Sequence, residues 1–288
     1  MKRTRPGCVL FLIDRSWSMA EPCGPGTSQT LAEGVAGAVN KLLHELIVRS
    51  IADPGEGPRN YYDVGVIGYG QSAYGDDEAV ESGFGGVLAG RELVSIAELA
   101  ANPMRIDQVE LTGRHHDGRT VAAPVWVDPE AGFSTPMCGA IELAGSWLSR
   151  WVADHPDSFP PIVINITDGI VTDRGSDGSG LSEWARRLRS LGTEDGNVLL
   201  FNVFLTAGTA RPIFFPSTPS GLPQPAGTDL FETASPLPAS MVEVARSAGF
   251  PAEPGARGMV FNADLSALVS FLRIGTERLD RFVDAARA

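Results

Sequence analysis

The sequence has few of the side chains that usually build a zinc site or a disulfide framework. It contains three cysteines and four histidines in 288 residues, with no Cys-x-x-Cys or His-x-x-x-His spacing. Three cysteines leave at least one thiol unpaired in any disulfide scheme. Cys8 opens an apolar run and Cys138 lies in a predicted helix, so we expect both to be small core residues. Reduced thiols are typical of a cytoplasmic protein, which is the location we predict.

Long hydrophobic runs are also absent. No segment approaches the roughly 18 consecutive apolar residues of a membrane span, so we expect no insertion into a membrane. The basic segment 2–5 is followed by an apolar run, as in a signal peptide. That run ends at Asp14, however, and is shorter than the roughly 7–15 apolar residues that a signal peptide needs. We therefore interpret residues 8–13 as the first strand of the fold.

Positive charge is scarce. The chain has 23 Lys and Arg against 35 Asp and Glu, which gives a formal net charge of −12. Such a surface repels phosphate, so we expect neither a nucleic acid nor an anionic membrane as a partner. An acidic surface suits a bound cation or a basic partner, although its main effect is solubility.

Motifs of common enzyme classes are missing as well. There is no Gly-x-Ser-x-Gly elbow, no phosphate-binding Gly-x-x-x-x-Gly-Lys-Ser/Thr loop, and no Gly-x-Gly-x-x-Gly after a strand. We therefore predict a protein that is not an enzyme.

Apolar runs typical of buried strands alternate with segments of helical periodicity. This order predicts one α/β domain over residues 1–288, with a doubly wound, mostly parallel sheet, helices on both faces and one antiparallel edge strand. Strands are expected over 8–13, 61–69, 161–166, 197–206 and 258–262, and helices over 30–51, 96–100, 136–152, 181–191, 239–248 and 265–286.

Three segments interrupt this alternation. Residues 83–131 predict an inserted hairpin whose turn lies at 116–119, where His115 and His116 are either exposed turn residues or a metal site. The proline-rich segment 207–238 predicts a long irregular loop. The third is the loop 173–180, in which Asp173 and Asp177 are either solvated or hold a second cation.

Polar residues follow the first strand directly. The segment Asp14–Ser18 has the pattern Asp-x-Ser-x-Ser and ends the apolar run. Ligands of open α/β sheets bind at the carboxyl ends of strands, so we expect chemistry here. Carboxylate and hydroxyl oxygens suit Mg²⁺, with Mn²⁺ or Ca²⁺ as alternatives, better than they suit zinc or copper.

Two further polar groups belong to the same predicted edge. Thr135 precedes Pro136 at the start of a helix and is expected to be its N-cap. Asp168 follows the buried strand 161–166. The three segments together predict one oxygen-rich site made of Asp14, Ser16, Ser18, Thr135 and Asp168.

The order Asp-x-Ser-x-Ser, then Ser134-Thr135-Pro136-Met137, then Ile166-Thr167-Asp168-Gly169 resembles the von Willebrand factor A (VWA) domain with its metal-ion-dependent adhesion site. The resemblance implies that both serines coordinate the ion, that Thr135 does so in one state, and that the two aspartates act through waters. It also implies that an Asp or Glu of a partner protein completes the coordination. The alternative is that these side chains only cap loops and the helix, without a metal.

Without a signal or anchor, the chain is similar to the intracellular bacterial VWA proteins. That resemblance implies an adaptor in a stress, conflict or ATPase-associated system, whose partner is an AAA+ ATPase or a kinase/phosphatase module. Alternatives are a secreted adhesin and a Mg²⁺-dependent phosphohydrolase, although Ser16 stands where haloacid dehalogenase-type enzymes have a second Asp.

Three expectations concern the surroundings of the site. Arg15 and Trp17 occupy positions where the extracellular forms of the family have small residues. We expect Arg15 at the rim of the metal site, and Trp17 either packed beneath the loop or presented as an aromatic contact. The resemblance implies that the last helix, 265–286, shifts with metal occupancy, and a static helix is the alternative.

Overall fold

The computed structural model describes residues 5–24, 26–53, 55–73, 78–110, 120–208, 210–263, 267–271 and 273. In this part of the chain no helix combines the length and apolarity needed to cross a membrane. The predicted turn 116–119 with His115 and His116 lies outside the described residues, as does most of the predicted last helix. Residues 267–271 of that helix are helical.

A mostly parallel sheet forms the centre of the molecule, in the order β11-β12-β10-β7-β1-β2-β3, with β4 also paired to β2. Strands β12, β10, β7, β1 and β2 run parallel. The predicted α/β class and the antiparallel edge are therefore confirmed, the edge being β3. The bounds are β1 (Gly7–Arg15), β2 (Tyr62–Gln71), β3 (Glu78–Ser82), β4 (Val94–Ser95), β7 (Ile162–Thr167), β10 (Leu199–Phe204), β11 (Ile213–Phe214) and β12 (Met259–Phe261).

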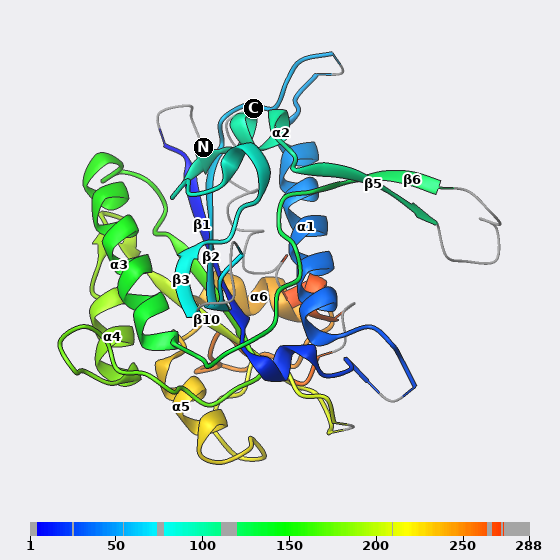
Figure 1. Cartoon of the computed structure of the whole chain (residues 1–288). Helices are drawn as coiled ribbons and strands as arrows, with labels where there is room; N and C mark the ends of the chain where they lie inside the picture. Colours follow the sequence, from blue (N-terminus) through cyan, green and yellow to red (C-terminus); the bar gives the residue numbers. More distant parts are fainter. Residues whose placement is uncertain are drawn as a thin grey trace.

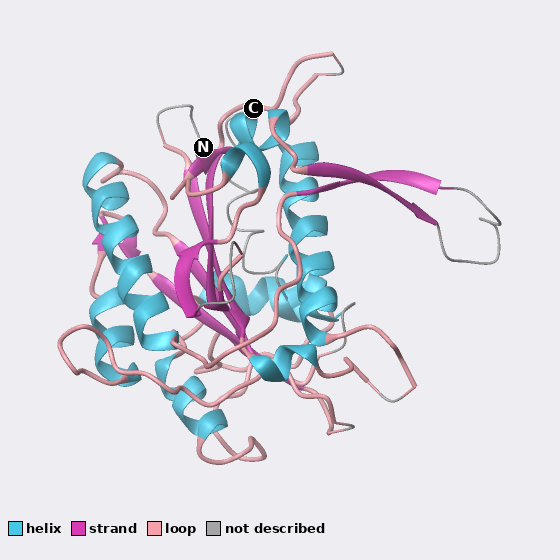
Figure 2. Ribbon diagram, viewed as in Figure 1, coloured by secondary structure: helices cyan, strands magenta, loops and turns pink. Residues whose placement is uncertain are grey.

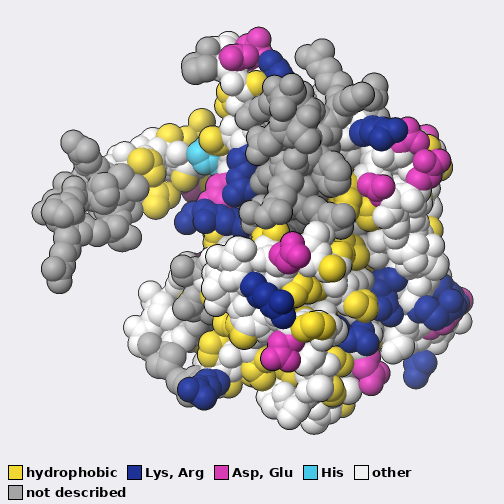
Figure 3. Space-filling view, turned by 180° about the vertical axis from the view of Figure 1, so that it is seen from behind, with side chains coloured by type: hydrophobic (Ala, Val, Ile, Leu, Met, Phe, Trp, Pro, Cys, Tyr) yellow, Lys and Arg dark blue, Asp and Glu magenta, His cyan; other side chains and the backbone are white. Residues whose placement is uncertain are grey.

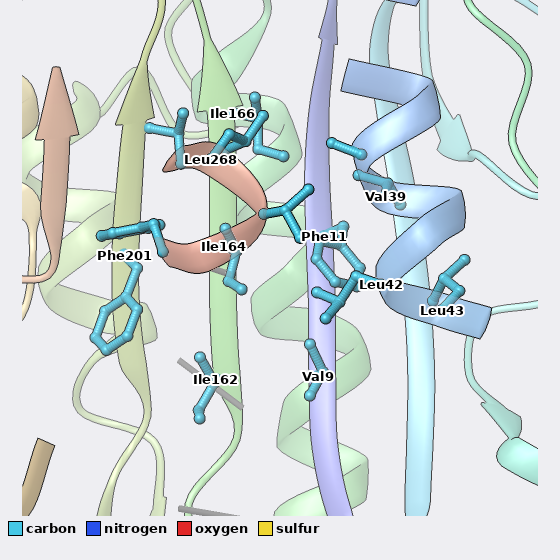
Figure 4. Close-up of a cluster of buried hydrophobic side chains, with 14 of the residues drawn as sticks. Val9, Phe11, Val39, Leu42, Leu43, Ile162, Ile164, Ile166, Phe201 and Leu268 are labelled. Carbon is cyan, nitrogen blue, oxygen red and sulfur yellow. The ribbon is translucent and has the colours of Figure 1, made fainter. Parts of the chain in front are cut away.

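Helices cover both faces of the sheet (Figures 1 and 2). One face packs on α1 (Leu31–Ser50), α2 (Ile96–Ala101) and α6 (Ala239–Ser247), and the other on α3 (Met137–Asp154), α4 (Leu181–Leu188) and α5 (Ala226–Thr233). Strand β1 supplies alternate residues to the two cores, because successive side chains of a strand point to opposite faces. Figure 4 shows Val9 and Phe11 of β1 near Leu42 of α1. A strand buried on both faces explains the nearly unbroken apolar run before Asp14.

The predicted hairpin is confirmed as a two-stranded ribbon of β5 (Arg105–Glu110) and β6 (Thr120–Val125). The ribbon extends beyond the sheet beside α1 (Figures 1 and 2). Hydrophobic side chains lie along it in Figure 3, where Lys and Arg are interspersed with Asp and Glu over the visible face. A second small ribbon pairs β8 (Gly192–Thr193) with β9 (Gly196–Asn197), and short 3₁₀ turns form η1 (Trp17–Ala20) and η2 (Gly86–Leu88).

The prediction of an irregular loop over 207–238 is wrong in part. Strand β11 lies in this segment and pairs antiparallel with β12, so the sheet has an antiparallel strand at each edge. Helix α5 follows directly after Pro225. Proline is well tolerated where a helix starts, because the first N–H groups of a helix have no partner within it. Buried Leu230 and Phe231 then hold α5 against the sheet.

The order of the strands creates a switch point at β1. The chain crosses from β1 to β2 on one side, and β7 later pairs with the other side of β1. Crossovers that leave in opposite directions open a crevice at the carboxyl ends of the two central strands. The register Ile13↔Ile166 puts Asp14 level with Thr167 at this edge.

Candidate functional site

Asp14 lies at the end of β1, fully buried. Its Oδ1 accepts a hydrogen bond from the Ser16 backbone N–H at 2.8 Å, and its Oδ2 accepts one from the Thr167 hydroxyl at 2.6 Å. The position of this carboxylate is therefore fixed by its own loop and by the neighbouring strand β7.

The two serines continue the loop after β1. Their hydroxyl oxygens lie 3.2 Å apart, and the Ser18 hydroxyl donates to Asp168 Oδ1 at 2.8 Å. Ser16 is buried, whereas Ser18 and Asp168 are half-buried. The contact between residues 18 and 168 brings the Asp-x-Ser-x-Ser motif together with the end of β7, as the sequence predicts.

Thr135 approaches from the segment before α3. A β-carbon placed on Gly169 would lie 3.3 Å from the Thr135 hydroxyl oxygen and 3.7 Å from Asp14 Oδ2. Both oxygens thus face the same glycine, which leaves the space between them free of a side chain. All five predicted residues meet at one edge of the sheet, and we call Asp14, Ser16, Ser18, Thr135 and Asp168 the acidic cluster.

The prediction that Thr135 caps α3 is wrong. Its side chain makes no capping bond, and the N-terminus of α3 is capped instead by Asp173, whose carboxylate accepts from the N–H groups of Cys138 and Gly139 at 2.9 and 2.8 Å. The Thr135 N–H donates to the Thr172 hydroxyl at 2.8 Å. The loop after β7 therefore holds the segment that carries Thr135.

The two carboxylates of the loop 173–180 have partners within the protein. Asp173 is a helix cap rather than a solvated carboxylate. Asp177 is solvent-exposed and bonds Arg187 at 2.6 Å, and this contact lowers the pKa of Asp177 to about 2. Each carboxylate thus has partners of its own within the protein.

The two carboxylates of the acidic cluster are in an unfavourable electrostatic state when both are ionised. Burial raises the pKa of Asp14 above its usual value. Burial and, second, the charge of Asp14 raise the pKa of Asp168 to about 6. Within the described part of the chain, no Lys or Arg forms an ion pair with either carboxylate. Two carboxylates that share a poorly solvated place repel each other when both are ionised, and a bound cation would offset that repulsion.

The chemistry of the donor set fits a hard divalent cation. Two carboxylates and three hydroxyls are oxygen ligands, which Mg²⁺ and Mn²⁺ prefer. Among the described residues there is no group of three or more His, Cys, Asp or Glu side chains that could hold a metal. A metal site in this part of the chain would therefore depend on hydroxyl ligands as well as on carboxylates.

The prediction that Arg15 lies at the rim of the site is wrong, and one of the two alternatives for Trp17 is excluded. Arg15 is buried and turns away from the site, toward Gly83 O at 3.4 Å and Glu81 at 3.9 Å. It passes over Gly68, where a side chain would overlap its guanidinium group. Trp17 does not pack beneath the loop, because 69% of its surface is exposed. The alternative interpretation of Trp17, a presented aromatic side chain, agrees with this exposure.

Sequence reasoning missed the supporting roles of Thr167, Thr172 and Asp173, which hold the acidic cluster in place. Thr167 directly precedes Asp168, and its adjacency to the motif was the available signal. Its hydroxyl also accepts from the Gly169 N–H at 3.1 Å, so it ties the two strand ends together. The three cysteines are free, and Cys8 and Cys138 are buried as predicted.

Comparison with known proteins gives distant structural likenesses. No protein-family model matches the sequence, and no curated protein matches it significantly. Proximal thread matrix protein 1 from the mussel byssus is 14% identical over 94% of this chain and 47% of its own, with a TM-score of 0.45. A von Willebrand factor type A protein from Catenulispora acidiphila is 15% identical over 70% of this chain and 34% of its own, with a TM-score of 0.36.

The pilus adhesin RrgA from Streptococcus pneumoniae is 12% identical over 91% of this chain and 34% of its own, with a TM-score of 0.31. This chain spans less than half the length of each of these three structures. Likenesses this distant do not assign a function. The fold class rests on the strand order and the two helical layers described above.

Proposed function

We propose that this protein is a non-catalytic adaptor that binds another protein through a divalent cation held by the acidic cluster. One observation carries the proposal: two buried or half-buried carboxylates and three hydroxyls converge at the switch point of the sheet without a basic partner among the described residues. The resemblance of the three motifs to the VWA adhesion site supports the same function.

Ser16, Ser18 and Thr135 would supply hydroxyl oxygens to the ion, and Asp14 and Asp168 would supply negative charge. We propose Mg²⁺ as the ion, because Mg²⁺ prefers oxygen ligands and retains waters. The cation would offset the cost of two ionised carboxylates in a poorly solvated place. An Asp or Glu of the partner would displace one of the retained waters.

A metal bridge also explains how a chain with a net charge of −12 could bind an acidic group. The ion presents positive charge at one point of a surface that otherwise repels carboxylates. We propose a cytoplasmic partner, either an AAA+ ATPase or a kinase/phosphatase module, and three free thiols agree with that location. A surface receptor as the only partner would favour the secreted adhesin instead.

Calorimetric titration of the metal-stripped protein tests the metal, and co-purification with and without Mg²⁺ tests the bridge. We expect one Mg²⁺ or Mn²⁺ per chain and partner capture that EDTA abolishes. No heat with either ion contradicts the metal site. Capture that is unchanged in EDTA contradicts the bridge but leaves the metal site standing.

A further inference from the structure

Each loop that contributes to the acidic cluster also exposes one large apolar side chain. Trp17 lies between Ser16 and Ser18 in sequence and is 69% exposed. Phe133, two residues before Thr135, is 37% exposed, and Ile170, two residues after Asp168, is 65% exposed. We call Trp17, Phe133 and Ile170 the apolar rim.

Backbone contacts fix two members of the rim, Trp17 and Phe133, relative to each other and to the acidic cluster. The Trp17 N–H donates to Phe133 O at 3.2 Å, and the adjoining Gly132 N–H donates to Arg15 O at 2.7 Å. These two bonds join the loop after β1 to the segment before α3. Ile170 follows Asp168 by two residues, and Asp168 accepts from the Ser18 hydroxyl at 2.8 Å, so the third loop is joined to the same loop after β1.

Phe133 shows that this arrangement has an energetic cost. Its φ of +60° is in the left-handed region, which a bulky residue without glycine's freedom rarely adopts. A strained backbone conformation persists only where the surrounding structure enforces it, and residues with such conformations are frequent at binding sites. Phe133 therefore leaves 37% of its surface exposed at a strained position beside the acidic cluster, which is consistent with a role in binding.

Single exposed apolar side chains are common and need no explanation. The described residues include others, such as Val48 in the last turn of α1 and three on the β5–β6 ribbon. The rim differs because its three members come from three segments far apart in sequence, and each lies within two residues of a proposed ligand. Apolar groups around a polar centre are typical of interface hot spots, where they exclude water from a charged contact.

We propose that the apolar rim selects a partner segment in which the metal-binding Asp or Glu is flanked by large aliphatic or aromatic residues. This inference rests on the proposed metal-dependent function and adds the recognition rule for the partner. The carboxylate completes the coordination of the ion, and its apolar neighbours pack on the rim. Burial of these neighbours removes water around the ion, which strengthens the contact between the cation and the carboxylate.

The test uses three synthetic peptides and the full chain with Mg²⁺. One peptide has the core Phe-Leu-Glu-Leu-Phe, the second Ser-Gly-Glu-Gly-Ser, and the third Phe-Leu-Gln-Leu-Phe. We expect the apolar-flanked Glu peptide to bind about tenfold more tightly than the Ser/Gly-flanked Glu peptide. The Gln peptide should bind only as weakly as the apolar-flanked Glu peptide binds in EDTA. Equal affinities of the first two peptides, or no binding of the first, overturn the rule.

Three variants locate the effect: Trp17→Ser, Ile170→Ser and Phe133→Asn, the last because Asn tolerates a positive φ. Each should weaken the apolar-flanked peptide about fivefold to tenfold while the affinity for Mg²⁺ alone stays within about twofold. Val48→Ser is the matched control, since Val48 is 54% exposed at the far end of α1, and it should change neither affinity. Rim variants that bind the peptide as the wild type does contradict the proposal.

The Mg²⁺ titration separates this inference from the proposed function. If Mg²⁺ binds and acidic peptides bind regardless of their neighbours, the recognition rule is wrong and the metal-dependent function stands. If the wild type binds no Mg²⁺, both are wrong.

Discussion

Two polar clusters of the described residues lie close together, because strand β7 carries Asn165 of one and ends directly before Asp168 of the other. The first is the acidic cluster at the strand ends. The second, here called the asparagine network, lies deeper in the sheet. In it the Tyr69 hydroxyl donates to Asn165 at 2.7 Å, Asn165 donates to Asn202 at 3.1 Å, and Asn202 donates to Leu230 O at 2.7 Å.

The two clusters differ in charge and in how completely they are satisfied. The asparagine network contains only neutral groups, and its chain of donors ends on a backbone carbonyl and on Thr233. The acidic cluster contains two carboxylates whose pKa values are raised by burial. Satisfied neutral networks stabilise and specify a fold, whereas unpaired buried charge costs free energy. The comparison therefore favours a structural role for the asparagine network, and it supports the binding role proposed for the acidic cluster.

The largest effect is expected for Asp14→Asn. Mg²⁺ affinity should fall about a hundredfold or more, because a charged group of the site is lost. Asn keeps an acceptor for the Ser16 N–H and can still bond Thr167, so the fold should persist. Relief of repulsion with Asp168 should raise the Tm of the metal-free protein slightly.

Calorimetry and thermal melting measure the two outcomes of Asp14→Asn. Asp177→Asn is a matched control in a neighbouring loop, and it should leave Mg²⁺ affinity unchanged. A collapse of the fold in Asp14→Asn would assign a structural role to Asp14 and remove the contrast between the clusters.

The second prediction concerns Asn165→Ala in the asparagine network. The free energy of unfolding should fall by about 2 kcal/mol, because buried Tyr69 and Asn202 lose a partner. Mg²⁺ affinity of the folded variant should stay near the wild-type value. Urea denaturation measures the first quantity, and a loss below about 0.5 kcal/mol would contradict the structural role.

The third prediction is a pH dependence of metal binding. Since the pKa of Asp168 is about 6, Mg²⁺ affinity should fall about tenfold between pH 7 and pH 5, as the proton competes with the ion. The raised pKa also means that the native state binds more protons than the unfolded chain between about pH 4 and pH 6. The Asp168 carboxyl should therefore lower the stability of the metal-free protein as the pH rises from about 4 to about 6.

Asp168→Asn is the control for the pH dependence, because the asparagine side chain does not titrate. The Asp168→Asn variant should bind Mg²⁺ weakly at both pH values. The stability of its metal-free form should depend less on pH than that of the metal-free wild type. Mg²⁺ affinity that is independent of pH in the wild type would show that Asp168 stays ionised throughout.

The smallest effect is expected for Asp173→Ala. The N–H groups of Cys138 and Gly139 lose their acceptor, which should cost about 1 kcal/mol of stability. Mg²⁺ affinity should decrease only slightly, because Asp173 acts on the start of α3 near Thr135. Asp173→Asn keeps one acceptor oxygen and should lose less stability in the same urea titration. Equal losses of stability in both variants would show that the charge of Asp173, rather than its hydrogen bonds, stabilises the start of α3.

The sequence was sufficient to predict the sheet and the convergence of the five site residues. Both follow from apolar runs that end in polar residues, because parallel strands place their carboxyl ends at one edge. The antiparallel strand β11 and helix α5 were missed because prolines dominate their segment. The binding of a metal to the acidic cluster stays a prediction.

Details around the site could not be predicted from local sequence. Strand β1 continues through Arg15, so alternation and the space above Gly68 direct that side chain away from the cluster. The cap of α3 comes from Asp173, more than thirty residues further along the chain. The asparagine network was also missed, although Asn165 and Asn202 are paired across β7 and β10 and each interrupts an apolar run.

Anomalous diffraction from crystals soaked in Mn²⁺ tests the contrast between the two clusters most directly. We predict one strong peak in contact with the hydroxyl oxygens of Ser16 and Ser18, at about 2.2 Å, and none beside Asn165 or Asn202. The peak should vanish in Asp14→Asn crystals grown and soaked in the same way. A wild-type map without a peak at the acidic cluster would contradict the account.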